Sequence, residues 1–358
     1  MTRTIALSLD QFYRPQPGGI ATYVRGLVRG LASLEDEQLR LVGVAPRGVA
    51  TQRVDDLALA QVTTASIGVL NRVWFQRPLG VPPNADVVHA TSLAGPFGGG
   101  HAGAVHSVAI FDLLWRDEPS ASTRRGIRFH ERRLQFVKRR HDVRLLCASP
   151  GLASRLAAEG FEPGRLHEVR LGVDDAATPD DVAAVRAALL ARGVVGPFTL
   201  YVGTREPRKN LERLVRAHQI AAARTKELGP LVLVGPPGWG SVDVGDSVVL
   251  GEVSRPLLRG LYRDATAVAY VPRAEGWGLP PVEALALGTR VVASANTPSV
   301  AANEEVVLVD PLDVEAIANG LAAVLAQGDD EASRARRRDT VSELTWRNVA
   351  LDHLAAWR

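Results

Sequence analysis

Short runs of apolar residues alternate along the chain with longer segments of helical periodicity. Unbroken apolar runs are typical of strands covered on both faces, as in parallel sheets. Helical segments between such strands predict βαβ units with right-handed crossovers. The predicted strands lie at residues 5–7, 41–44, 86–89, 106–111 and 145–147 in the first half, and at residues 200–202, 231–234, 248–250, 267–271, 291–293 and 306–309 in the second.

This strand pattern restarts near residue 197, after a polar and alanine-rich stretch, so we place a linker within residues 172–197. The domains are predicted at residues 1–180 and 181–344, with a final helical segment at 345–358. The predicted fold class is α/β, with two Rossmann-like domains facing across a cleft. Ligands of such sheets bind at the carboxyl ends of the strands.

Composition narrows the function classes. The chain has 358 residues, which suits two domains, and its 46% hydrophobic content argues against disorder. The net charge of +3 is compatible with anionic ligands. No zinc-finger or RNA-binding aromatic signature is present, so nucleic acid is not an expected partner.

Targeting signals are also missing from the sequence pattern. No apolar stretch of about 20 residues is present, so no membrane-spanning helix is expected. The first residues, MTRTIALSLD, are interpreted as a strand and not as a signal peptide. Cys147 is the one cysteine, which excludes an internal disulfide and a cysteine metal cluster. We expect a buried thiol there and a cytoplasmic protein.

Residues 275–283, EGWGLPPVE, follow the predicted strand that ends at Val271. Their glycines allow close approach of a ligand to the backbone. The two prolines can begin a helix, whose free N–H groups can hold an anion such as a diphosphate. Glu275 before the helix and Glu283 in its expected first turn are placed to accept hydrogen bonds from sugar and ribose hydroxyls. A glycine turn before an ordinary helix explains the same residues equally well.

A cationic turn lies at residues 203–211, GTREPRKNL, directly after another predicted strand. Arginine can bind phosphate in a fork, and lysine supplies a point charge. Arg205, Arg208 and Lys209 beside a glycine turn therefore favour a phosphate site. The alternative is a solvated loop in which Glu206 pairs with an arginine.

Together the two motifs resemble those of glycosyltransferase family 4, whose members are retaining enzymes with the GT-B fold. Residues 203–211 are similar to the family's phosphate-binding turn. Glu275 and Glu283 match its two glutamates separated by seven residues, and the EALALG sequence at 283–288 continues the match. The resemblance is strongest over residues 198–311, and both motifs in this order are more specific than either alone.

The resemblance implies roles for the parts of the chain. It makes residues 1–180 the acceptor side and residues 181–344 the nucleotide-sugar side. It also implies that the helix at 345–358 returns to the first domain, where Trp346 and Trp357 pack.

The resemblance further implies individual site residues. Arg208 and Lys209 would bind the donor diphosphate, Glu275 would hold donor-sugar hydroxyls, and these three would be the catalytic residues. Glu283 would hold the ribose, and Val253 would line the base pocket. The remaining implied donor-binding residues are Gly18, Gly19, Thr204, Gly276, Trp277, Gly278 and Leu279, with residues 276–279 acting through their backbone.

In the first half, Gly18 and Gly19 follow the first predicted strand and open a helix. Two glycines at a helix start suit an anion or a closely approaching sugar, although a simple turn is equally consistent. The third spaced glycine of the dinucleotide pattern is missing, which disfavours a nucleotide-dependent oxidoreductase.

Phe111 and Asp112 end the predicted strand at 106–111. Many members of the family place histidine before the aspartate, against the sixth carbon of the donor sugar. Phe111 instead predicts an apolar pocket suited to a 6-deoxy sugar such as rhamnose, because a methyl packs where a hydroxyl would lose a hydrogen bond. His89 is expected to line the same donor-sugar and acceptor cleft, with a structural histidine as the alternative.

Residues 124–141 carry eight Lys or Arg residues against Glu131 alone. Ile127, Leu134 and Val137 share one helical face. Such charge suits an anionic acceptor or peripheral contact with an anionic membrane; a solvated amphipathic helix is the alternative. The arginines at 334–338 are expected to form a solvated face.

The predicted reaction transfers a hexose or 6-deoxyhexose, mannose- or rhamnose-like, from a nucleotide-diphosphate sugar to a saccharide or lipid-linked acceptor. Cell-surface polysaccharide or glycolipid synthesis is the expected context. No cofactor and no metal is expected, because the cations take the metal's place and the acidic pairs at 55–56, 174–175 and 180–181 lie in linking stretches. An epimerase or phosphorylase of the same fold and a non-catalytic nucleotide-sugar-binding module stay open as alternatives.

Overall fold

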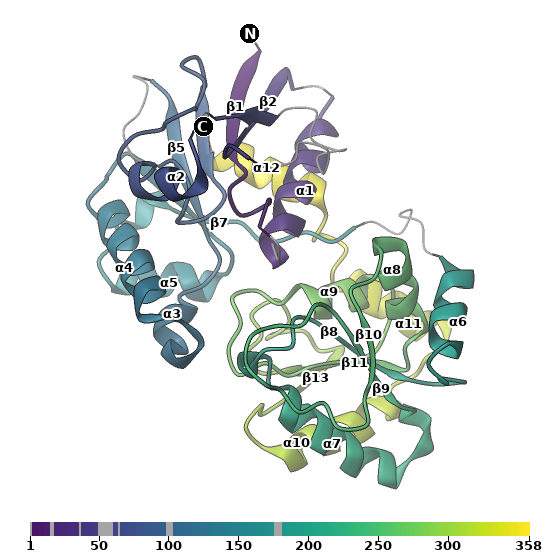
Figure 1. Ribbon diagram of the computed structural model, residues 1–358. Coiled ribbons are helices and arrows are strands. Elements are labelled where there is room, and N and C mark those ends of the chain that lie inside the picture. The colour runs from purple at the N-terminus through teal and green to yellow at the C-terminus, as the bar shows by residue number, and fades with distance from the viewer. Residues whose placement is uncertain are drawn as a thin grey trace. The chain divides into compact units, whose positions relative to one another are not determined.

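A computed structural model describes residues 2–14, 18–35, 37–48, 60–63, 65–97, 103–174 and 181–358. Contacts divide the chain into two compact units, each with its own parallel sheet (Figure 1). Unit 1 comprises Met1–Gly172 and Leu344–Arg358, and unit 2 comprises Val173–Glu343. The division after Gly172 falls at the start of the predicted linker and before the boundary predicted at 180/181. The predicted α/β class with two Rossmann-like units is confirmed.

Unit 1 contains a seven-stranded sheet of order β3-β2-β1-β4-β5-β6-β7, with parallel pairing throughout. The strands are β1 (Arg3–Ser8), β2 (Leu39–Ala45), β3 (Ala60–Val62), β4 (Val87–Ala90), β5 (Val105–Ile110), β6 (Val143–Cys147) and β7 (Leu166–Glu168). The helices are α1 (Gly18–Ala32), α2 (Ile67–Val73), α3 (Leu114–Asp117), α4 (Arg124–Lys138), α5 (Pro150–Ala158) and α12 (Trp346–Ala356). The sequence pattern missed β3 and β7, because three-residue edge strands carry too little periodicity to stand out.

The core of unit 1 lies between the sheet and its helices. Leu134 and Val137 of α4 pack in one apolar cluster with Leu145 and Cys147 of β6, all completely buried. The helical face predicted from residues 127, 134 and 137 is therefore confirmed. The buried thiol predicted at Cys147 is confirmed as well.

The last helix, α12, lies beside α1 in unit 1 (Figure 1). A Cβ at Gly26 would lie 2.0 Å from the indole ring of Trp346, and one at Gly30 would lie 2.0 Å from its carbonyl oxygen. The two helices can approach this closely only because α1 carries no side chain at these positions. Trp357 then donates from its indole nitrogen to Ser107 Oγ at 2.8 Å.

Unit 2 contains a six-stranded parallel sheet of order β10-β9-β8-β11-β12-β13. The strands are β8 (Thr199–Val202), β9 (Leu231–Val234), β10 (Val248–Gly251), β11 (Ala267–Tyr270), β12 (Val291–Ser294) and β13 (Val306–Val309). The helices are α6 (Val182–Leu190), α7 (Leu211–Arg224), α8 (Arg255–Asp264), α9 (Leu279–Ala286), α10 (Val314–Ala323) and α11 (Glu331–Asp339). Helices α7 and α10 run along one side of the sheet, and α8, α9 and α11 along the other (Figure 1). The sequence pattern located all six strands.

One expectation about unit 2 is wrong. Arg337 of α11 does not belong to a solvated face, because its side chain is completely buried. Its guanidinium donates to the carbonyl oxygens of Gly288 at 2.7 Å and Gly328 at 2.9 Å and pairs with Asp329 at 3.2 Å. Helix α11 packs against α9, and Arg337 stabilises the turn that follows α9. In the described part of the chain, no helix combines the length and the apolar character needed to cross a bilayer.

Candidate functional site

The sheet order of unit 2 reverses between β8 and β11, which are neighbours in space but not in sequence. A crevice forms outside the carboxyl ends of two such strands, because their following loops run to opposite faces of the sheet. The loop after β8 contains the cationic turn, and the loop after β11 contains residues 275–278. Topology therefore brings both sequence motifs to the one place in this sheet where a ligand site is expected.

Asn210 joins these two loops. It has a left-handed backbone with φ of 63°, which asparagine tolerates better than most residues, at the end of a short 3-10 turn (Pro207–Lys209). Its buried side-chain amide donates to the carbonyl oxygens of Val271 at 2.9 Å and Pro311 at 2.7 Å. Sequence reasoning missed this role; its signal was an asparagine between a turn and a helix start.

Arg208 and Lys209 meet Glu275 from the other loop. Lys209 Nζ donates to Glu275 Oε2 at 2.5 Å and to the Tyr270 hydroxyl at 2.6 Å. Arg208 donates to the same Glu275 oxygen at 3.3 Å and to Glu206 Oε1 at 2.6 Å. These charged side chains are only 12–14% exposed. The charges of Arg208 and Lys209 are thus balanced by Glu206 and Glu275. Glu206 pairs with an arginine, as the alternative interpretation predicted, and the cationic turn also meets Glu275 of the second motif.

Electrostatics keep Glu275 ionised. Burial raises its pKa, but the charges of Lys209 and Arg208 outweigh burial and hold the pKa at about 2. Burial lowers the pKa of Lys209 in spite of the neighbouring carboxylate. Glu275 Oε1 accepts from the Gly276 N–H at 3.1 Å, and no further contact occupies it within the described residues. This oxygen retains a lone pair that a hydroxyl group can approach.

Gly278 caps the start of α9 with a φ of 97°. A Cβ at this position would lie 2.4 Å from Thr297 Cγ2, so glycine alone fits. The helix begins at Leu279, one residue before the prolines. The N–H of Leu279 has no intrahelical partner, whereas Pro280 and Pro281 carry no N–H. Trp277 is 5% exposed, and its indole N–H has no partner within the described residues. Its side chain is therefore buried, and a role of its backbone toward a ligand stays a prediction.

Glu283 lies in the second turn of α9, and the prediction of the first turn is wrong by one turn. The Tyr262 hydroxyl donates to Glu283 Oε2 at 2.8 Å. Burial raises the pKa of Glu283, and the nearby Arg255 guanidinium opposes that shift. Sequence reasoning missed Tyr262 and Arg255, because their proximity depends on how α8 packs beside α9.

The smaller predicted contacts of unit 2 flank this cluster of loops. Val253, partly exposed, directly precedes Ser254, which caps the start of α8. The Thr204 carbonyl oxygen accepts a hydrogen bond from the Tyr201 hydroxyl at 3.1 Å. Arg205 joins its backbone to Pro237 in an isolated parallel bridge.

The candidates in unit 1 come from three segments, and two of them, Phe111 and His89, contact Tyr23 of α1. Gly18 and Gly19 are exposed at the start of α1, and Gly18 has a φ of 57°. Phe111 follows β5, is half-buried, and packs edge-on against Tyr23 with ring centroids 5.1 Å apart. Asp112 Oδ1 accepts from the Leu114 N–H at 3.0 Å at the beginning of α3.

The prediction that His89 lines a ligand cleft is wrong, because its side chain is completely buried. Its Nε2 is hydrogen-bonded to the Tyr23 hydroxyl at 2.7 Å and its Nδ1 to Ser107 Oγ at 2.8 Å. The same Tyr23 hydroxyl contacts His353 of α12 at 2.7 Å. Burial lowers the pKa of His89 well below its usual value and that of His353 to about 4. Both rings are neutral structural elements that join α12 to α1 and β4.

Some predicted positions lie outside the described residues, namely 55–56, 175 and 180. Asp181, beside them, caps α6 by accepting from the Ala184 N–H at 2.9 Å. Within the described ranges, no three His, Cys, Asp or Glu side chains gather as a metal site would require. Metal independence therefore stays a prediction.

Part of this chain is similar in sequence to known glycosyltransferases. The family described as glycosyl transferases group 1 matches residues 194–340, which lie within unit 2. Over 176 residues the chain is 34% identical to O-antigen chain mannosyltransferase B of Escherichia coli, a match covering 45% of each chain. Over 215 residues it is 34% identical to D-inositol 3-phosphate glycosyltransferase of Mycobacterium sp. (strain JLS), a match covering 55% of this chain and 44% of the relative. The matched segment thus spans less than half the length of these relatives.

The whole fold is similar to the crystal structure of Anabaena HepE in complex with UDP and glucose. The TM-score is 0.76 at 15% identity, and the match covers 99% of this chain and 98% of the other. The fold is the GT-B fold, and residues 194–340 of unit 2 are similar to the glycosyl transferases group 1 family.

Proposed function

We propose that this chain is a retaining, metal-independent glycosyltransferase of family 4. It transfers a hexose or 6-deoxyhexose from a nucleotide-diphosphate sugar to a saccharide or lipid-linked acceptor. The proposed location is the cytoplasm, and the proposed context is the synthesis of a surface polysaccharide or glycolipid. One observation carries the proposal: Arg208, Lys209 and Glu275 meet beside the start of α9 at the switch point of unit 2. The match of residues 194–340 to a glycosyltransferase family supports it.

The donor diphosphate is proposed to bind at the backbone of residues 276–279, which leads into α9, with Arg208 and Lys209 alongside. The bond between the anomeric carbon and the diphosphate oxygen breaks, and the acceptor oxygen bonds to that carbon on the same face. The acceptor proton passes to the departing diphosphate. Negative charge grows on the diphosphate during this step, so cations and a helix start fixed in advance stabilise the transition state more than the ground state.

The two glutamates have different proposed roles. Glu275 orients Lys209 and Arg208 through its Oε2 and offers Oε1 to a hydroxyl of the sugar. Glu283, with Tyr262 on one oxygen, accepts from the ribose. Neither carboxylate acts as a nucleophile in this proposal.

Two observations bear on the transferred sugar. Phe111 favours a 6-deoxyhexose for the packing reason given above. Relatives named O-antigen chain mannosyltransferase B and serotype-specific mannosyltransferase WbdA support mannose. Donor competition separates them: a clear preference for GDP-mannose or UDP-glucose over deoxysugar donors refutes the role of Phe111.

The proposal is tested by a thermal-shift screen against a panel of nucleotide sugars, followed by nucleotide release with saccharide and lipid-linked acceptors. A ligand that binds the folded state raises the melting temperature. Lys209→Met is expected to abolish both responses, whereas Lys226→Met, at an exposed lysine of the same unit, preserves them.

Each alternative has its own outcome in these assays. Turnover of donor without acceptor indicates an epimerase, and sugar release that needs inorganic phosphate indicates a phosphorylase. Donor binding without nucleotide release from any acceptor indicates a binding module. No stabilisation by any nucleotide sugar refutes the proposal.

A further inference from the structure

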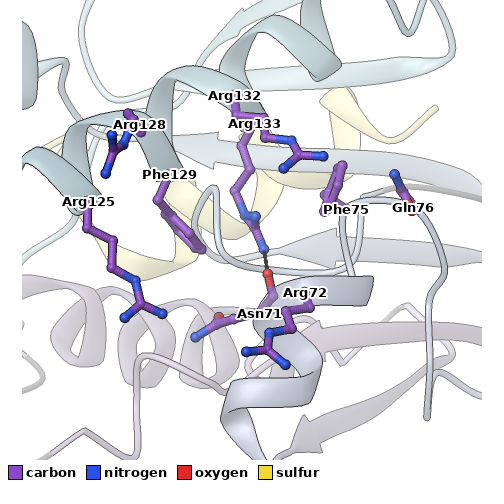
Figure 2. Close-up of a pocket in the computed structure, with 9 residues that line it drawn as sticks. All are labelled: Asn71, Arg72, Phe75, Gln76, Arg125, Arg128, Phe129, Arg132 and Arg133. Carbon is purple, nitrogen blue, oxygen red and sulfur yellow. Dashed lines mark hydrogen bonds between the residues drawn. The ribbon is translucent and has the colours of Figure 1, made fainter.

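A pocket of about 560 Å³ lies in unit 1 between α2 and α4 (Figure 2). Its volume is in the range of small-molecule sites, about 300–1,000 Å³. Five of its nine lining residues are arginines, and none is acidic. These are Arg72 from α2 and Arg125, Arg128, Arg132 and Arg133 from α4.

The arginines of α4 face this pocket because of their spacing. Residues three and four apart lie on one side of a helix, which places Arg125, Arg128 and Arg132 in a row. Their side chains and that of Arg72 are exposed, and within the described residues no ion pair engages them. Four like charges therefore stand around one opening without a carboxylate between them.

Arg133 is different, because it is 3% exposed. Its guanidinium lies 3.9 Å from the ring centroid of Phe129 and 5.1 Å from that of Phe75. It donates to the carbonyl oxygen of Asn71 on α2, as the dashed line in Figure 2 shows, while its Nε has no hydrogen-bond partner among the residues that the structure describes. Burial lowers the pKa of Arg133 to about 10, and Asp10 opposes this shift from a distance without forming an ion pair in the described structure. A buried guanidinium with an unmade hydrogen bond is costly unless an anion completes it.

The one acidic residue of α4 does not compensate this charge. Glu131 is turned toward α3, where Arg116 donates to it at 2.8 Å and the Trp115 indole at 2.7 Å. The solvated amphipathic helix considered for residues 124–141 would not need a buried arginine, and it would not collect its free arginines around a single pocket.

We propose that this pocket binds the phosphate group of an organic phosphate ester. Tetrahedral phosphate offers oxygens in several directions, so guanidinium forks from α2 and α4 can bind it together, whereas a planar carboxylate suits one fork. The rings of Phe75 and Phe129 supply an apolar wall for the organic part. The ester is either a soluble molecule or a lipid headgroup. The pocket is lined only by residues of unit 1, and none of them belongs to the proposed donor site.

The test measures binding to the full chain by isothermal titration, with pyrophosphate and glycerol phosphate as soluble probes and without nucleotide sugar. Arg125→Gln/Arg128→Gln is expected to weaken binding about tenfold or more. Arg139→Gln, at an exposed arginine just beyond α4 that does not line the pocket, is the control and should leave affinity within about twofold. Arg133→Met is a second variant, with circular dichroism to verify folding.

The outcomes discriminate between sites and sources. Binding lost in Lys209→Met and kept in the arginine double variant belongs to unit 2 and overturns the proposal, as does equal loss in Arg139→Gln or binding of neither probe. Vesicles containing phosphatidylglycerol identify the source. If the arginine double variant reduces vesicle binding and Arg139→Gln preserves it, the ligand is a lipid headgroup. If the soluble probes bind and the vesicles do not, the ligand is a soluble ester. Equal loss of vesicle binding in both variants overturns the proposal. Sugar transfer can fail independently, because no donor enters this experiment.

Discussion

Separating Lys209 from Glu275 should reveal how strongly the two motifs of unit 2 depend on each other. Their side chains are 12% and 13% exposed and meet at 2.5 Å. Lys209→Met keeps the length of the side chain but leaves the carboxylate with Arg208, Tyr270 and a backbone N–H. Glu275→Gln keeps the shape but leaves the ammonium without its counter-charge.

The expected magnitude follows from burial. Breaking one partner of a buried pair costs about 3–5 kcal/mol, and the partial exposure of Lys209 and Glu275 favours the lower end, about 3 kcal/mol. The pKa of Glu275 agrees: a fall from 4.5 to about 2 corresponds to about 3 kcal/mol. In a domain of this size about 3 kcal/mol lowers the melting temperature by roughly 6–12 °C. The double variant should lose about as much as either single variant, because no unpaired charge remains.

Scanning calorimetry near neutral pH measures the melting temperatures of the wild type, the two single variants and the double variant. The matched control is Arg224 with Glu315, an ion pair of the same unit at 3.0 Å whose side chains are 46% and 60% exposed. Glu315→Gln should cost about 1 kcal/mol or less. The reasoning is refuted if Lys209→Met and Glu275→Gln cost no more than this control, or if their effects add in the double variant.

Three further outcomes are expected. The Glu275 contribution to stability is present above about pH 4.5 and is lost as pH falls toward 2, so the melting-temperature difference between wild type and Glu275→Gln should shrink between about pH 5 and pH 3; a constant difference argues against the shifted pKa. Gly26→Ala should destabilise unit 1 by about 1–3 kcal/mol through collision with Trp346, and Trp346→Leu in the same chain should recover part of that loss; an unchanged melting temperature contradicts the packing. Burial raises the pKa of Cys147 to about 12, so a thiol reagent should titrate no thiol in the native protein and one in denaturant; rapid native labelling contradicts its burial.

The sequence by itself determined the architecture. Unbroken apolar runs, which are typical of strands covered on both faces, are a local property of the sequence. They located eleven strands and the restart of the pattern. It also determined that the cationic turn and the glycine-proline helix start follow strands, because turn and cap chemistry are local too. Alternating strands and helices allow only a few strand orders, and the observed order of unit 2 brings these two loops together.

Only the tertiary structure decided which polar groups meet and which are buried. Lys209 and Glu275 are 66 residues apart in the chain, so no spacing rule reveals that they neutralise each other. His89 and Arg337 look solvent-facing in sequence, but His89 is buried beneath α12, and Arg337 is buried where its own helix, α11, packs against α9. The arginines of α4 acquire a shared pocket only where α2 lies opposite them. Burial and charge pairing depend on contacts between distant segments, and a local pattern carries no information about such contacts.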